Sequence, residues 1–216
     1  RIAIFCPAEY EREVAFHRTL TEFQYALSNG RITYYLQPQV DMETGKIIGA
    51  EALTRWIDKD GSLISPATFI PALEESGFVV TLDKYNKYIW QGVAIWLRER
   101  LDRGLRVVPV SLNVSRVDIL ACDVAEHMGA LAAQYNLPPE LMRIEITETA
   151  YTGESEAVDK LTADLHTRGF STYMDDFGTG QSTLAMLKNV NVDVIKFDRT
   201  DRKSTRLNSS HLSRSR

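Results

Sequence analysis

The chain has 216 residues, of which 44% are hydrophobic and 25% are charged, a composition typical of a globular domain with one sizeable core. A net charge of −4 argues against nucleic-acid polymers as partners, and the sequence contains no run of about 18 apolar residues that could span a bilayer. The two cysteines, Cys6 and Cys122, form neither a disulfide framework nor a zinc motif. These features favour a cytoplasmic protein, although a segment upstream of Arg1 could tether a longer parent to a membrane.

The first half of the chain predicts helices around a hairpin. Apolar residues at helical spacing, ended by Asn29-Gly30, predict the first helix, and two strand patterns joined by a short polar turn predict an antiparallel hairpin. Pro66 stands at the first position of a further helix. The expected elements are a helix over 9–28, strands over 32–40 and 47–53, and helices over 65–75 and 82–103.

From residue 106 onward, strand and helix patterns alternate. The expected strands cover 106–114, 142–148, 171–176 and 192–198, and the expected helices lie near 123–135, 154–168 and 181–188. This alternation predicts parallel βα units, and polar residues at the strand ends favour a (β/α) barrel. An open doubly wound sheet is the rival fold, but it usually has a glycine-rich first turn that this sequence lacks.

Five of the expected strands have carboxylate, amide or amine side chains at or near their ends. These residues are Glu51, Asn113, Glu145 with Glu148, Asp175 with Asp176, and Lys196 with Asp198. Because residues two apart on a strand share a face, the polar member of each strand can point to the barrel axis. Several carboxylates gathered at one mouth repel one another and lose hydration unless cations compensate. The pattern therefore predicts one site assembled from strand ends.

The residue types at these strand ends indicate a particular chemistry. Carboxylate and amide oxygens suit Mg²⁺ or Mn²⁺ better than zinc or copper, and the four histidines lie away from the strand ends. The adjacent Asp175 and Asp176 suggest a pair of cations that activate water against a phosphodiester. Lys196 would orient the water or stabilise negative charge, and Arg55, four residues after Glu51, could bind a phosphate through two hydrogen bonds.

Each of these residues also has an ordinary structural explanation. Lys196 could extend its ammonium into water, Arg55 could pair with Glu51, and Asp175-Asp176 could end a strand in a turn. Asp176-Phe177-Gly178 also resembles a metal-binding motif of kinases, but the glycine-rich and catalytic loops of kinases are absent from the sequence. The occurrence of all the polar residues together, at successive strand ends, favours a site.

Seven motifs, taken in chain order, resemble the EAL domain family from about Leu20 to Asp198. They are Tyr35-Leu36-Gln37-Pro38, Glu51-Ala52-Leu53-Thr54-Arg55-Trp56, Ser65-Pro66-Ala67-Thr68-Phe69-Ile70-Pro71, Asn113-Val114-Ser115, Glu145-Ile146-Thr147-Glu148, Asp175-Asp176-Phe177-Gly178-Thr179-Gly180 and Lys196-Phe197-Asp198. The resemblance implies a TIM-like α/β barrel whose first strand is antiparallel. It also implies hydrolysis of cyclic di-GMP to linear pGpG with Mg²⁺ or Mn²⁺ in a two-metal site.

The resemblance further implies roles for individual residues. The metal ligands would be Glu51, Asn113, Glu145, Asp175 and Asp176. Lys196 would hold the attacking water, and Glu148 would support the site beside the catalytic residues. Gln37, Arg55 and Asp198 would form the substrate-binding side, with Asp198 in a supporting role.

Two departures from the family pattern bear on activity. Gln181 stands where the family commonly has Tyr or Phe, in a loop that helps dimerisation and organises the metals. The family's seventh and eighth strands, which include a glutamate ligand, are not found, so about six of eight strands are expected. We therefore expect the intact parent to be the phosphodiesterase and the 216-residue chain to hydrolyse no cyclic di-GMP. The alternative is an inactive EAL module that binds cyclic di-GMP or a protein partner.

The resemblance, together with the composition of the C-terminal residues, divides the chain into three parts. Residues 1–19 would be the end of an upstream GGDEF domain and a linker helix, and residues 20–201 the EAL domain. Residues 202–216, with five basic residues and no acidic one, would be a non-native or disordered tail rich in Ser and Arg. The expected partners are cyclic di-GMP, a GGDEF or sensor domain in the same parent, and a second copy in a homodimer.

Overall fold

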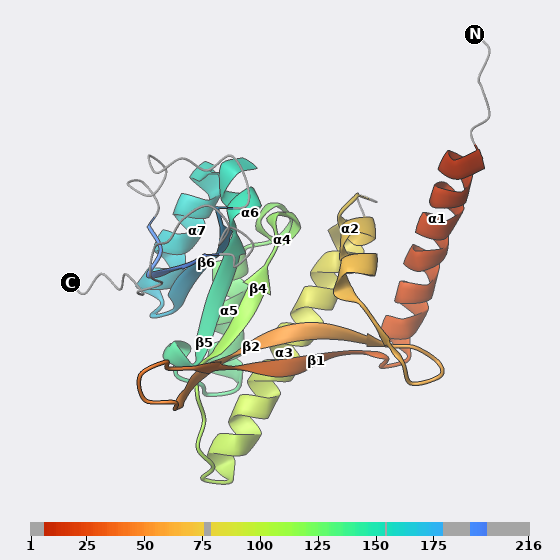
Figure 1. Cartoon of the computed structure of the whole chain (residues 1–216). Helices are drawn as coiled ribbons and strands as arrows, with labels where there is room; N and C mark the ends of the chain where they lie inside the picture. Colours follow the sequence, from red (N-terminus) through yellow and green to blue (C-terminus); the bar gives the residue numbers. More distant parts are fainter. Residues whose placement is uncertain (1–6, 76–78, 154, 179–190, 198–216) are drawn as a thin grey trace.

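The N-terminal half of the computed structural model consists of a long helix, a hairpin and two helices (Figure 1). The structure describes residues 7–75, 79–153, 155–178 and 191–197. Its first elements are α1 (Pro7–Ser28), β1 (Ile32–Val40), β2 (Ile47–Ile57), β3 (Leu63–Ile64), α2 (Pro66–Glu75) and α3 (Val79–Asp102). Gly30 and Gly45 have φ angles of 65° and 66°, which allow the chain to leave α1 and to turn within the hairpin.

The following part of the described chain alternates strands with helices. These elements are β4 (Val110–Val114), α4 (Arg116–Ala121), α5 (Val124–Gln134), the 3₁₀ helix η1 (Pro139–Leu141), β5 (Met142–Thr147), α6 (Glu148–Gly153), α7 (Ser155–Thr167), β6 (Ser171–Phe177) and β7 (Val194–Phe197). The strand order is β1-β2-β4-β5-β6-β7, with β3 paired to β2. β1 is antiparallel to β2, and from β2 to β7 the neighbours along this path are parallel. Among the described residues no pairing joins β7 to β1, so this wall of a barrel does not close.

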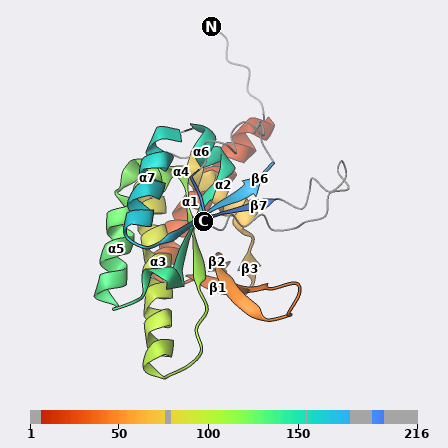
Figure 2. The ribbon, with the colours of Figure 1, turned by 90° about the vertical axis from the view of Figure 1, so that its left-hand side faces the viewer.

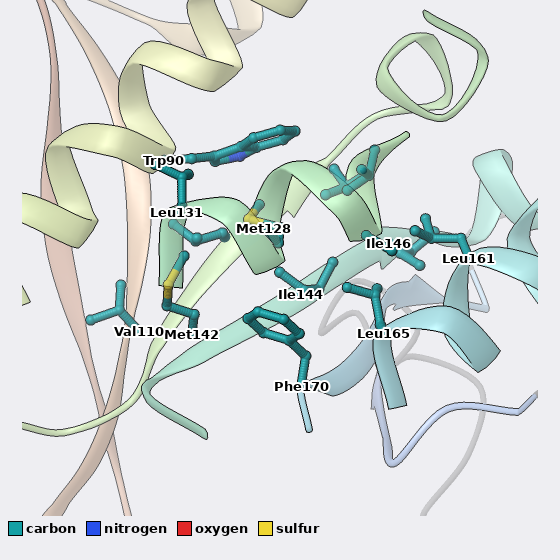
Figure 3. Close-up of a cluster of buried hydrophobic side chains, with 14 of the residues drawn as sticks. Trp90, Val110, Met128, Leu131, Met142, Ile144, Ile146, Leu161, Leu165 and Phe170 are labelled. Carbon is teal, nitrogen blue, oxygen red and sulfur yellow. The ribbon is translucent and has the colours of Figure 1, made fainter. Parts of the chain in front are cut away.

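Buried apolar side chains hold a layer of helices against one face of the sheet. Val110 on β4 and Met142 and Ile144 on β5 are fully buried, and they pack in one cluster with side chains of α3, α5 and α7. Figure 3 shows Met142 and Ile144 beside Met128 of α5, and Figure 2 shows the helices on one side of the strands. Each such side chain contributes about 1.5–3 kcal/mol when it is buried. Since this face is covered by helices, the opposite face of the strands is left for polar residues.

A smaller aromatic cluster joins α1 and α2 to the hairpin. The rings of Phe23 on α1, Trp56 on β2 and Phe69 on α2 lie 5.5 Å apart, measured between centroids, in each of the three pairs. All three residues are at most 2% exposed. Edge-to-face and stacked arrangements of this kind add to the gain from burial. The cluster therefore anchors the hairpin at the end remote from its turn.

The expected fold is confirmed in its main features. The hairpin, its antiparallel pairing and the parallel units that follow are present, and β2 extends beyond its expected end to Ile57. Several boundaries differ from those expected. The strand expected over 106–114 begins only at Val110, and the strand expected over 142–148 ends at Thr147, because Glu148 begins α6. The short elements β3, α4 and α6 were not predicted. The helix expected near 181–188, Gln181 and the tail over 202–216 lie outside the described residues.

Candidate active site

Three carboxylates from three strands meet on the inner face of the sheet. Glu51 on β2, Glu145 on β5 and Asp175 on β6 each offer an oxygen, and these oxygens lie within 4.8 Å of one another. The strand register explains this convergence, because Glu51 pairs with Ser111 on β4 and Glu145 pairs with Asn113 two residues further along. Because side chains alternate between the two faces of a strand, Glu51 and Glu145 lie on the same face of the sheet. The three residues are called the carboxylate cluster below.

The ammonium of Lys196 on β7 lies among these carboxylates. Its Nζ donates to Glu145 Oε2 at 2.6 Å and to Glu51 Oε2 at 3.0 Å, and it lies 3.6 Å from Asp175 Oδ2. Burial of the ammonium lowers the pKa of Lys196, but Glu145, followed by Glu51 and Asp175, raises it more, to about 12. Lys196 is therefore charged at neutral pH, and one positive charge faces three carboxylates.

Glu145 is the most deeply buried member of the carboxylate cluster, with a side chain that is 0% exposed. Burial raises the pKa of Glu145, and the neighbouring Glu51 carboxylate raises it further, whereas Lys196 opposes both. Glu145 Oε1 is nevertheless buried without a hydrogen-bond partner among the residues that the structure describes.

This donor set fits a divalent cation. A buried carboxylate oxygen without a partner is costly, and the excess of two negative charges in the cluster is costly as well. A hard cation bound by carboxylate oxygens removes both costs, and oxygen ligands are those that Mg²⁺ and Mn²⁺ prefer. The carboxylate cluster could therefore hold a metal ion.

Asn113 fixes the orientation of one carboxylate in the cluster. Its Nδ2 donates to Glu51 Oε1 at 3.2 Å, so its amide oxygen is the atom that could coordinate a cation. The backbone of Asn113 is held in turn, because the indole Nε1 of the buried Trp90 donates to its carbonyl oxygen at 3.2 Å. The structure thus brings Asn113 to the cluster, as the sequence predicted.

Gln37 and Arg55 lie on the hairpin beside the cluster. Gln37 on β1 is directly opposite Glu51, and Arg55 is four residues beyond Glu51, so all three share the inner face. The guanidinium of Arg55 lies 5.7 Å from the ring centroid of Tyr35, which is 49% exposed. Arg55 Nη1 donates to its neighbouring backbone oxygen of Thr54 at 2.7 Å. An exposed amide, an aromatic ring and a guanidinium therefore line the hairpin next to the carboxylates.

Glu148 contacts the loop that follows β6. Its side chain is buried, and its Oε2 accepts a hydrogen bond from the backbone N–H of Gly178 at 2.7 Å. Gly178 has a φ of 98°, a conformation that a side chain would strain, and it directly follows β6. Glu148 thus holds the chain just after Asp175 and Asp176, which is a supporting position.

Asp176 does not join the cluster of described carboxylates. Asp176 is exposed and has a φ of 57°, and as the neighbour of Asp175 on a strand it starts from the opposite face. The pairing of β6 with β7 is also irregular between Met174 and Phe177, where Asp176 lies. Asp198 lies outside the described residues. Its role, and that of Asp176 as a ligand, stay predictions.

Sequence reasoning did not single out Ser111, Arg143 or Trp90. Ser111 and Arg143 each lie two residues before a predicted ligand, so strand alternation could have identified them as inward-facing. Trp90 lies on α3 among apolar residues, and no pattern in the sequence indicates that its indole reaches Asn113.

Comparison with known families agrees with this geometry. The EAL domain family matches residues 20–210. The chain therefore belongs to the EAL domain family, whose TIM-like barrel the strand order reproduces in part.

Named relatives and a solved structure are similar to most of the chain. PdeB of Escherichia coli (strain K12), named a probable cyclic di-GMP phosphodiesterase, is 31% identical and matches 82% of this chain and 33% of its own length. The cyclic di-GMP phosphodiesterase RocR of Pseudomonas aeruginosa is 30% identical and matches 87% of this chain and 47% of its own length. The PaMucR phosphodiesterase in complex with c-di-GMP has a TM-score of 0.72 at 27% identity, covering 85% of this chain and 73% of that one.

The matched region is only a part of most of these relatives. The chain spans about a quarter to a third of the length of the first curated proteins it matches.

Within the described ranges, no helix combines the length and the apolar character that crossing a bilayer requires.

Proposed function

We propose that this chain forms the site-bearing part of a metal-dependent phosphodiesterase that hydrolyses cyclic di-GMP to linear pGpG. The observation that carries the proposal concerns the described residues: the buried Oε1 of Glu145 has no hydrogen-bond partner among them, and a single ammonium among them offsets the three carboxylates of the cluster. Hydrolysis is favoured over binding alone because a cation held by these carboxylates could activate water against a phosphodiester. Relatives named as cyclic di-GMP phosphodiesterases support the same substrate.

Mg²⁺ or Mn²⁺ is the proposed cofactor, in a two-metal site. Glu51, Asn113, Glu145, Asp175 and Asp176 would hold the ions, and oxygen donors of this kind favour these hard cations. When bound, such ions lower the pKa of water and stabilise the charge of the phosphodiester under attack.

The remaining residues would act on the water and the substrate. Lys196, charged and directed at the carboxylates, would orient the attacking water through its ammonium and stabilise developing negative charge. Gln37 and Arg55 would bind the nucleotide, because an amide and a guanidinium supply donors to phosphate and guanine oxygens. Asp198 would support this substrate side, and Glu148 would keep the loop at Gly178 in place.

The wider setting follows from the same proposal. Cyclic di-GMP is an intracellular signal in this scheme, so we place the domain in the cytoplasm. A GGDEF domain or a sensor upstream in the parent is supported by MucR of Pseudomonas aeruginosa, named a bifunctional diguanylate cyclase and phosphodiesterase, of which the chain matches 26%. A homodimer is proposed by family resemblance alone.

The decisive experiment compares turnover with binding in the full-length protein. Purified wild-type protein with Mn²⁺ should release pGpG, measured by chromatography, and Glu51→Gln or Glu145→Gln should lower kcat by about 100-fold or more, which is about 3 kcal/mol of barrier. Glu126→Gln on the exposed face of α5 is the matched control and should change nothing. If Glu51→Gln turned over normally, the metal assignment would be wrong. Binding of cyclic di-GMP by the wild type without release of pGpG would identify a receptor instead.

A further inference from the structure

A second polar layer lies on the inner face, beneath the carboxylate cluster. Arg143 precedes Glu145 by two residues on β5 and therefore shares its inner face. Its Nη1 donates to Gln39 Oε1 on β1 at 3.4 Å, and its guanidinium lies 5.3 Å from the ring centroid of Tyr173 on β6. No ion pair joins Arg143 to a carboxylate within the part of the chain that the structure describes. One guanidinium thus connects the hairpin with β5 and β6.

Gly49 makes room for this contact. A Cβ atom at Gly49 would lie 2.6 Å from Arg143 Nη1 and 2.6 Å from Gln39 Oε1, closer than side-chain carbons approach such atoms. The carbonyl oxygen of Pro109 lies 3.4 Å from the same position, so the backbone of β4 bounds the space on another side. Arg143 and Gln39 therefore fill the volume that a larger residue at position 49 would occupy, at the junction of β1, β2 and β4.

This junction is the narrow part of the sheet. β1 and β2 pair over nine residues, whereas β2 pairs with β4 only at Ala50–Val110 and Glu51–Ser111. The N–H of Ala50 donates to Pro109 O at 2.9 Å beside these pairs. Glu51 thus lies on a short ladder between the hairpin and the parallel strands. Its distance from Glu145 depends on how firmly the hairpin is held there.

We propose that Arg143 is a positioning residue for the carboxylate cluster. Through Gln39 and Tyr173 it holds the hairpin against β5 and β6, and so it fixes Glu51 relative to Glu145. Arg143 acts through the hairpin, because it hydrogen-bonds to Gln39 on β1 and packs on Tyr173 on β6, both outside the carboxylate cluster. The consequence for cation binding rests on the proposed function, whereas the effect on the junction does not.

The direction in which the Kd for Mn²⁺ changes when Arg143 is removed distinguishes a positioning role from a purely electrostatic one. Arg143 carries a positive charge two residues from Glu145, so a purely electrostatic influence would oppose a bound cation. Removal of Arg143 would then tighten cation binding. If Arg143 positions Glu51, its removal loosens the carboxylates and weakens cation binding instead. The two explanations therefore predict opposite changes in the Kd for Mn²⁺.

The first measurement is amide hydrogen exchange in the apo chain. In Arg143→Met the amide of Ala50 should exchange about tenfold faster than in the wild type, because the hairpin opens locally at the junction. The amides of Leu112 and Ile144, within the β4–β5 ladder, should keep their protection. Arg106→Met is the matched control: this exposed arginine also reaches the hairpin, since Nη2 donates to Ile47 O at 3.5 Å, but from outside the junction. It should leave Ala50 unchanged.

The second measurement is the affinity for Mn²⁺, followed by electron paramagnetic resonance of the free ion. Arg143→Met and Gln39→Ala should each raise the Kd about tenfold, at the lower end of the range for residues that orient metal ligands. The double variant should be no weaker than either single variant, because both remove the same contact. Arg143→Lys, which keeps the charge but not the planar donor group, should recover only part of the affinity. Arg106→Met should bind Mn²⁺ as the wild type does.

Each outcome is decisive. Unchanged exchange at Ala50, or a loss of protection spread over β4 and β5, overturns the positioning role. Tighter Mn²⁺ binding by Arg143→Met, or full additivity with Gln39→Ala, shows an effect of charge or two separate effects, and also overturns it. If the wild type binds no Mn²⁺, the proposed function fails, and exchange at Ala50 alone decides the role of Arg143.

Discussion

Lys196 Nζ donates to Glu145 Oε2 at 2.6 Å, although the two residues are 51 positions apart in the chain. This contact joins β7, the last described strand, to a carboxylate that is fully buried in β5. In the absence of a cation, Lys196 is the only described positive charge that contacts the carboxylate cluster. The ammonium therefore has two effects that can be measured separately, one on stability and one on cation binding.

The effect on stability is expected to depend on the cation. Lys196→Met leaves a buried carboxylate without its charge partner, which costs about 3 kcal/mol in the free energy of unfolding when the metal is chelated. A saturating divalent cation should restore most of this loss, because it compensates the same oxygens. Urea denaturation with EDTA and with Mn²⁺ measures the difference. Lys160→Met, an exposed lysine on α7, is the control, and equal losses in both buffers would contradict the expectation.

Lys196→Met is expected to bind a divalent cation more tightly than the wild type and yet to turn over substrate more slowly. Lys196 competes with a cation for oxygens of Glu51 and Glu145, so Lys196→Met should lower the Kd for Mn²⁺ about tenfold. Turnover should nevertheless fall strongly, because the ammonium no longer orients water. Titration of Mn²⁺ beside a pGpG-release assay tests both parts. Weaker binding of Mn²⁺ by the variant would show that Lys196 supports the cation site.

Cation binding should also stabilise the wild type. A ligand that binds only the folded state at 100 times its Kd adds about 2.7 kcal/mol to the free energy of unfolding. We therefore expect Mn²⁺ to raise the melting temperature, and EDTA to reverse the rise. Glu145→Gln should abolish most of the shift, because it replaces one carboxylate oxygen of the cluster by an amide. A shift of the same size in Glu145→Gln would place the cation elsewhere.

The Glu148–Gly178 contact should matter for order in the loop after β6. A charge-assisted hydrogen bond of this kind contributes about 1.5–3 kcal/mol, so Glu148→Ala should speed amide exchange at Gly178 and lower kcat. Glu148→Gln keeps an acceptor oxygen, so its rate of amide exchange at Gly178 and its kcat should lie between those of the wild type and those of Glu148→Ala. Glu156→Ala, an exposed glutamate in the first turn of α7, serves as the comparison. Normal exchange at Gly178 in Glu148→Ala would remove the supporting role.

The fold was predictable where apolar residues recur at the spacing of a strand or a helix. Alternation along 32–40 and the polar turn before Ile47 indicated the hairpin, and the paired register of Gln37 with Glu51 followed once the turn was formed. The six-residue helices α4 and α6 are too short to show a helical period. Their starts nevertheless have capping signals, because Ser115 and Asp118 form a capping box at α4, and Thr147 Oγ1 accepts a hydrogen bond from the N–H of Ala150 at 3.3 Å at the start of α6.

The candidate site was predictable by residue type but not by contact. Glu51, Glu145 and Asp175 follow from strand alternation, since each is the inward member of its strand. The contact of Arg143 with Gln39 depends on how the hairpin lies against β5, across 104 positions of sequence. Patterns of a few neighbouring residues cannot predict a contact between residues so far apart in the sequence. Asp176 stays a predicted ligand: strand alternation places it on the face opposite to Asp175, and its positive φ, uncommon at a residue other than glycine, has no reliable signal in the sequence.

The last prediction concerns Asp118, which holds the turn that follows Asn113. Asp118 is 0% exposed, and its Oδ2 accepts hydrogen bonds from Asn86 Nδ2 at 2.6 Å and from the Oγ and N–H of Ser115 at 2.6 and 2.8 Å. Asp118→Ala therefore leaves several partly buried donors unpaired and should cost about 3 kcal/mol in urea denaturation. Asp123→Ala removes a simple exposed helix cap and should cost about 1 kcal/mol. Equal costs would mean that the hydrogen-bond network of Asp118 adds nothing beyond the cap, and that Asn113 does not depend on this turn for its position.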